Sequence, residues 1–174
     1  MPCPGRLIFL ASVAALPISI AAAAHRDAAD RSPIYGVRLP PGYRDWKVIG
    51  VAHEKGDLNS IRVILGNRTA IQAFRRGQRP FPDGTVIARV AWKYVASPRN
   101  NAIFGQEQSF VTGDPTNVQV SAKDTVKYPG TGGWGYGQFI AGKANPDVDT
   151  LRTCYACHNR LPSSEDRVFT AYAP

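Results

Sequence analysis

Between residues 47 and 140 the chain is a series of short segments rich in β-branched and aromatic residues, separated by Gly, Pro and Asp. The clearest segment runs from Thr85 to Val95, where every second side chain from Val86 to Tyr94 is apolar. A period of two residues is typical of a strand with one buried face. The same criteria predict strands at 47–52, 60–65, 108–112, 117–122 and 134–140. The chain is therefore expected to be dominated by strands up to Pro146.

Short helices or turns are expected between and after these strands. One helix should end at Gly77, and another should carry residues 151–158 near the C-terminus. Residues 80–84 form a Pro-Gly turn, and residues 163–166 open a last short helix or turn. The side chains that could cap the two helices are Asn67 or Thr69 and Asp147 or Asp149.

The second of these helices carries the sequence Cys-Tyr-Ala-Cys-His from Cys154 to His158, a C-x-x-C-H motif of the kind that attaches c-type haem. Each thiol can add across one haem vinyl group to form a thioether, and the adjacent imidazole then binds the iron. A disulfide or half of a zinc site is the alternative, although zinc would need two further Cys or His ligands nearby. We predict one covalent haem c held by Cys154, Cys157 and His158, with His158 as axial iron ligand.

Residues 1–24 have the features of a secretory signal peptide: one positive residue, an apolar run, and four alanines ending at Ala24. The apolar run is shorter than the roughly 20 residues that a spanning helix needs, and an uncleaved anchor is the alternative. Cleavage near Ala24 would remove Cys3 and leave Cys154 and Cys157 as the only thiols. The expected location of the mature protein is the periplasm.

The mature chain is expected to form one domain. Its length of about 150 residues suits a single core, and neither a repeat nor a linker interrupts it. Residues 25–40 are polar and contain Pro, so they are interpreted as a flexible, loosely held arm, and residues 41–174 as the haem domain.

The charge is basic, with 21 Lys and Arg against 13 Asp and Glu and a net charge of +8. Such a surface could favour an acidic redox partner by steering the encounter. There is no nucleic-acid signature, because the basic residues are scattered along the sequence; they include Arg75, Arg76, Arg79, Arg89, Lys93, Arg99, Lys123 and Lys127.

Few residues of the chain could serve as a sixth iron ligand, and this limits the kinds of haem iron site that are expected. The only methionine is Met1, which leaves with the signal, so Met/His ligation of an electron-transfer cytochrome is not expected. His25 and His53 could in principle be sixth ligands, but an open, five-coordinate iron that binds small molecules is the preferred interpretation. Candidates for the distal pocket are Phe74, Phe81, Ile87 and Trp92, whereas Trp134, Tyr136 and Phe139 are expected to pack within the sheet.

Five blocks of the sequence together resemble the cytochrome P460 family, which includes the cytochromes c′-β. They are residues 41–46, 81–86, 132–134, 154–158 and 166–170, and they extend over nearly the whole mature chain. The resemblance implies an α+β fold with a predominantly antiparallel β-sheet and a few short helices. It also implies a single c-type haem on one sheet face and a homodimer.

The family contains two groups that differ in the residue beside the haem. P460 proteins cross-link a lysine to the haem and oxidise hydroxylamine, whereas c′-β proteins lack the cross-link and bind nitric oxide. The position that matches the lysine is Arg89, whose protonated guanidinium is a poor nucleophile. Lys93 shares its strand face but lies about 13 Å further along, which makes it a weak candidate. Arg89 is the distal candidate, with a surface or propionate-pairing role as its alternative.

Three functions follow from these observations. The first is a periplasmic protein that binds nitric oxide or related small nitrogen species. The second is a P460-type oxidoreductase acting on hydroxylamine or nitric oxide, with an external cytochrome as redox partner. The third is a simple electron-transfer cytochrome c, which the missing methionine disfavours.

Overall fold

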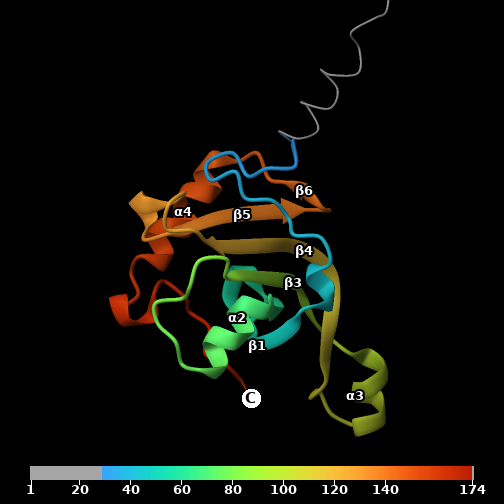
Figure 1. Ribbon diagram of the computed structural model, residues 1–174. Helices are drawn as coiled ribbons and strands as arrows, with labels where there is room; N and C mark the ends of the chain where they lie inside the picture. Colours follow the sequence, from blue (N-terminus) through green and yellow to red (C-terminus); the bar gives the residue numbers. More distant parts are fainter. Residues whose placement is uncertain (1–28, 174) are drawn as a thin grey trace, which may run out of the picture.

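The fold is one open antiparallel sheet with short helices (Figure 1), and the computed structural model describes residues 29–173. The strand order follows the sequence, so that each strand pairs with its sequence neighbours. The chain is therefore α+β and predominantly antiparallel, as predicted. The strands are β1 (Lys47–Glu54), β2 (Ser60–Gly66), β3 (Val86–Ala96), β4 (Phe110–Lys123), β5 (Trp134–Ile140) and β6 (Lys143–Ala144).

Three helices of the described chain follow from local capping chemistry: α2 (Arg68–Arg75), α3 (Pro98–Phe104) and α4 (Val148–His158). Asn67 caps α2, because its Oδ1 accepts a hydrogen bond of 2.9 Å from the Ala70 N–H. Of the alternatives in the sequence, Asn67 and Asp147 are the caps used. Four 3₁₀ turns complete the elements: η1 (Tyr43–Asp45), η2 (Gly56–Leu58), η3 (Pro129–Thr131) and η4 (Ser163–Glu165).

Strand β4 differs from the prediction, because the two short strands expected at 108–112 and 117–122 form one. The register between β3 and β4 is irregular around Trp92, which lies opposite Pro115. Proline has no N–H for the ladder and is tolerated at such a bulge. Helix α3 was not predicted either, although Ser97 at its N-cap followed by Pro98 is a helix-start signal.

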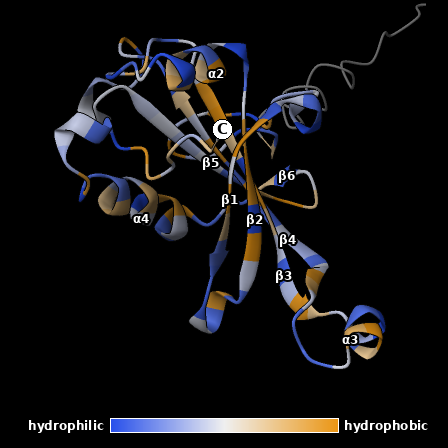
Figure 2. Cartoon of the chain, turned by 90° about the horizontal axis from the view of Figure 1, so that it is seen from below, coloured by the Kyte–Doolittle hydropathy of each residue, from blue (hydrophilic) through white to orange (hydrophobic). Residues whose placement is uncertain are grey.

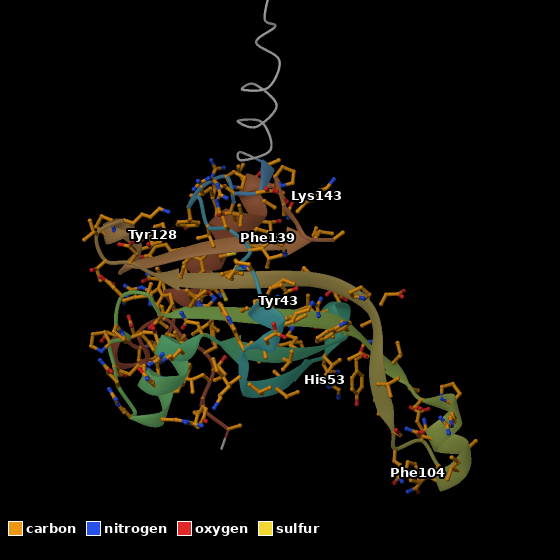
Figure 3. The ribbon with its side chains drawn as sticks, turned by 45° about the vertical axis from the view of Figure 1, so that its right-hand side comes forward. Tyr43, His53, Phe104, Tyr128, Phe139 and Lys143 are labelled. Carbon is orange, nitrogen blue, oxygen red and sulfur yellow. The ribbon has the colours of Figure 1, made fainter. Side chains whose placement is uncertain are left out.

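Helix α3 projects away from the rest of the domain at the far end of β3 and β4, and Phe104 lies in this projection (Figure 3). The sheet itself is buried on both faces. On one face, Ile64, Ile87 and Tyr136 pack with residues of α2 and with Cys154 of α4. We call this the α4 face, and Figure 2 shows α4 lying to one side of the strands. The opposite face is formed by apolar side chains that include Leu65, Val90, Val120 and Phe139.

The described part of the N-terminal segment packs against the sheet, which differs from the loosely held arm expected for residues 25–40. Ser32 is buried, and its Oγ donates a hydrogen bond of 2.9 Å to the backbone carbonyl of Tyr136. Val37 is also buried and donates from its N–H to Ser32 Oγ at 3.1 Å. The predicted signal peptide, its cleavage near Ala24, and His25 lie outside the described residues. Within 29–173, none of the helices has the length and apolar character to cross a membrane.

Candidate functional site

Helix α4 presents the two cysteines on successive turns. Asp147 begins the helix by accepting N–H bonds from Asp149 at 3.0 Å and Thr150 at 3.3 Å. Leu151, fully buried, fixes the helix against the domain. Cys154 is consequently half-buried against the α4 face of the sheet, whereas Cys157 is exposed, and both thiols are free.

The imidazole of His158 has a fixed orientation. Its Nδ1 lies 2.6 Å from the backbone carbonyl oxygen of Arg167. A carbonyl oxygen can only accept, so Nδ1 carries the proton and Nε2 keeps its lone pair for a metal. The ring lies against Tyr136 and Phe169, with centroids 4.9 and 5.0 Å away. Burial lowers the pKa of His158; the charge of Arg89 lowers it further, and the hydrogen bond with the Arg167 carbonyl partly offsets both effects. The lowered pKa favours the neutral ring, which is the form that binds iron.

The segment after α4 is attached to the sheet through a buried ion pair. Lys123 Nζ lies 2.8 and 3.0 Å from the two carboxylate oxygens of Asp166. The same carboxylate accepts the N–H of Phe81 at 2.7 Å and the indole N–H of Trp134 at 3.3 Å. Lys123 was counted in the sequence among scattered basic residues, but the structure buries it.

Arg89 lies on the α4 face in the middle of the sheet, where β3 pairs with β2 and β4 on either side. Its Nη2 donates to Asn117 Oδ1 at 3.3 Å, and its buried Nε has no partner among the described residues. Burial, followed by the nearby Arg62, lowers the pKa of Arg89 to about 10, so it stays cationic at neutral pH. Its charge also lowers the pKa of His158 and opposes the rise that burial causes in the pKa of Cys154. The structure thus brings Arg89 into the electrostatic neighbourhood of the motif.

Lys93 is not brought to the motif. It is exposed and lies opposite Ser60 at the end of β2, whereas Arg89 lies opposite Ile64. His53 is also directed elsewhere, because its ring stacks on Tyr94 with centroids 3.9 Å apart, at the end of β1 (Figure 3). Of the described residues considered for iron chemistry, Arg89 is the one whose charge acts on the pKa of His158.

The predicted distal-pocket residues divide between the two sheet faces. Phe74, Phe81 and Ile87 belong to the core of the α4 face, whereas Trp92 packs with the opposite face. Trp134 and Phe139 are buried in the sheet core as expected. The sequence did not predict that Tyr136, Phe169 and the carbonyl of Arg167 lie beside His158. For Phe169 and Arg167, their position within the block at 166–170 was the available signal.

The chemistry of these residues fits a c-type haem. Two free thiols and a neutral imidazole lie on one helix at the attachment spacing. The buried polar atoms of the described chain without a hydrogen-bond partner include two near this motif, Arg89 Nε and Tyr136 Oη. Buried polar groups are normally paired because desolvation is costly. Both atoms are therefore available to a polar group that the protein atoms do not supply.

A helix with a haem attachment motif packed on one face of an antiparallel sheet defines a haem-binding β-sheet protein. The sequence model of the family Cytochrome P460 matches residues 40–170, which is most of the chain. The chain belongs to the cytochrome P460 family, as the resemblance indicated, and the family implies a c-type haem cofactor with its iron. The comparison with curated proteins gave no match.

Proposed function

We propose that this protein carries a single covalent haem c and binds nitric oxide or a related small nitrogen species at the iron. Cys154 and Cys157 would form the thioethers, and His158 would be the axial ligand. The bound haem would supply an iron centre that accepts a small ligand. Support comes from the free thiols, from the Nδ1–H bond that leaves Nε2 free, and from family membership.

The observation that carries the proposal of binding without turnover is the position of Arg89. By the family resemblance it matches the position of the cross-linking lysine in P460 proteins, and a guanidinium is a poor nucleophile toward a haem carbon. Neither of two lysines nearby replaces it. Lys93 is exposed at the end of the sheet, and the Nζ of Lys123 is committed to Asp166 and to the carbonyl of Gly132 at 3.0 Å.

Arg89 also offers a chemical reason for selecting polar ligands. Its cationic guanidinium retains a buried N–H without a partner among residues 29–173. A ligand that gains negative character on the iron would accept a charge-assisted hydrogen bond from it. We assign this role to Arg89 in preference to pairing with a haem propionate.

Location and assembly are part of the proposal. We propose export to the periplasm through residues 1–24, and a homodimer by analogy with the family. The P460-type oxidoreductase, which would pass electrons from hydroxylamine or nitric oxide to an external cytochrome, is the competing function that the experiment distinguishes.

The experiment is the optical spectrum of the purified ferrous protein, combined with two activity measurements. The proposal expects one covalent haem per chain, a Soret band where ordinary haem c absorbs, tight nitric oxide binding, and no hydroxylamine turnover with an artificial electron acceptor. A strongly red-shifted Soret band together with turnover would instead establish the oxidoreductase. A six-coordinate ferrous spectrum that nitric oxide leaves unchanged would indicate an electron carrier.

A further inference from the structure

We propose that the buried Lys123–Asp166 ion pair is the positioning device for the axial histidine. By holding the backbone at Arg167, it would orient the carbonyl that accepts the His158 Nδ1–H and thereby set how strongly the ring binds iron. This inference rests on the proposed role of His158 as iron ligand. It concerns residues that the family resemblance did not single out as a pair.

The ion pair is desolvated and its hydrogen-bonding capacity is used. The Lys123 and Asp166 side chains are only 4% and 6% exposed. Besides each other, Lys123 binds the Gly132 carbonyl, and Asp166 accepts from the Phe81 N–H and the Trp134 indole. Asp166 is therefore fixed to β4, to β5 and to the turn before β3. Such a multiply bonded carboxylate leaves its own backbone little freedom.

The backbone of Asp166 leads directly to the acceptor of His158. Asp166 and Arg167 both have left-handed φ values, 45° and 61°. Non-glycine residues in this region persist only where surrounding contacts determine them. The Asp166 bonds provide these contacts on one side, and the buried Val168 provides them on the other. The direction of the Arg167 carbonyl therefore depends on where Asp166 is held.

A purely structural role is the alternative, although a buried ion pair often contributes little net stability compared with apolar packing. The two roles differ in what they do to the iron. Hydrogen bonding at Nδ1 makes the imidazole a more basic ligand, and this effect tunes the metal. Loosening the Arg167 carbonyl should therefore weaken the iron–histidine bond and raise the reduction potential, whereas a merely structural pair should alter only the unfolding midpoint.

The test is Asp166→Asn, which keeps the shape of the side chain and removes its charge. Resonance Raman spectroscopy of the ferrous protein would measure the iron–histidine stretching band, and a redox titration would measure the potential. We expect the band to move to lower frequency and broaden, and the potential to rise, while one haem stays covalently attached. The matched control is Asp149→Asn, the same substitution at an exposed position of α4, which should leave both readouts unchanged.

Lys123→Gln is the second variant, in case Asp166→Asn does not fold. The Gln amide can still donate to Asp166, so the change should be smaller and in the same direction, and Lys123→Arg should restore much of the wild-type band. A folded, haem-loaded Asp166→Asn or Lys123→Gln protein with the wild-type band and potential would overturn the inference. If the wild type holds haem but binds no nitric oxide, the proposed ligand is refuted, and the Raman and redox measurements still decide whether the ion pair positions His158. A wild type without covalent haem would refute both.

Discussion

Replacing Arg89 with alanine tests the chemistry of the iron site most directly. The guanidinium is cationic at neutral pH because its pKa is lowered only to about 10, and its buried Nε has no partner in the described structure. A hydrogen bond from a charged donor contributes about 1.5–3 kcal/mol. Loss of that bond should weaken binding of an anionic or polar ligand by roughly 10- to 160-fold. Carbon monoxide, which gains little charge on iron, should bind almost as before.

The assay compares cyanide binding to the ferric protein with carbon monoxide binding to the ferrous protein, both followed optically. Arg99→Ala is the matched control, because Arg99 is an exposed arginine of α3 and its loss changes the net charge equally. Only the Arg89 variant should discriminate between the two ligands.

Three outcomes of this assay lead to different conclusions. Ligand discrimination that changes as stated supports a distal donor. A shifted reduction potential with unchanged discrimination would assign Arg89 to a haem propionate and refute the reasoning about the ligand. If Arg89→Ala alters neither quantity, the guanidinium does not face the haem at all. Arg89→Lys restores the residue type that P460 proteins cross-link, and we expect at most a partial red shift of the Soret band, because a cross-link needs the amine against one haem edge atom.

Other parts of the chain make further predictions. Cys154→Ala combined with Cys157→Ala should abolish covalent haem, and haem retained through acid–acetone extraction would contradict the attachment site. His158→Ala should keep haem tethered but change the ferrous spectrum and the ligand affinity; an identical spectrum would mean that another group binds the iron. Asn67→Ala should lower the free energy of unfolding by about 1–2 kcal/mol in a urea titration, because α2 loses its N-cap. Hydrogen bonds, first from a threonine hydroxyl and then from backbone N–H groups, lower the pKa of Asp147. Its stabilising effect is therefore present above the ordinary carboxyl pKa of about 4 and lost as the pH falls through the lowered value. Urea titrations at successively lower pH should show a shallower acid loss for Asp147→Asn than for the wild type.

The strands could be predicted because the alternation of buried and exposed side chains along a strand appears directly in the order of apolar and polar residues. Strand β5 has the predicted bounds, and β3 begins and ends within one residue of its prediction. The break expected between residues 112 and 117 was wrong, since the neighbouring β3 absorbs Pro115 in an irregular register and the strand continues. The residues around Pro115 do not reveal that a neighbouring strand can accommodate this proline through an irregular register.

The residues of the candidate site also fall into a group that the sequence predicts and a group that only the tertiary structure brings together. The thiols and His158 form one short motif, and Arg89 was found by its position shortly after the family block at 81–86, so both were accessible from the sequence. The acceptor for His158 and the Lys123–Asp166 pair come together only through tertiary contacts, 43 positions apart in the case of the ion pair. Nothing in the sequence indicated the burial of Lys123, because in the alternation it falls on the polar side of the strand with Gln119 and Ser121.

The order of the strands also has a consequence for how the protein matures. Because every strand pairs with its sequence neighbours, the sheet can assemble by successive hairpins with little loop-closure entropy. The contacts most distant in sequence are made last along the chain, as where the Ala173 N–H donates to the Ile49 carbonyl at 2.8 Å. Before this closure α4 would not be held in place and both thiols would be accessible for haem attachment, whereas in the folded chain Cys154 is half-buried. We therefore expect the sheet to fold first, haem to be attached to an undocked helix, and the C-terminal segment to close over the product.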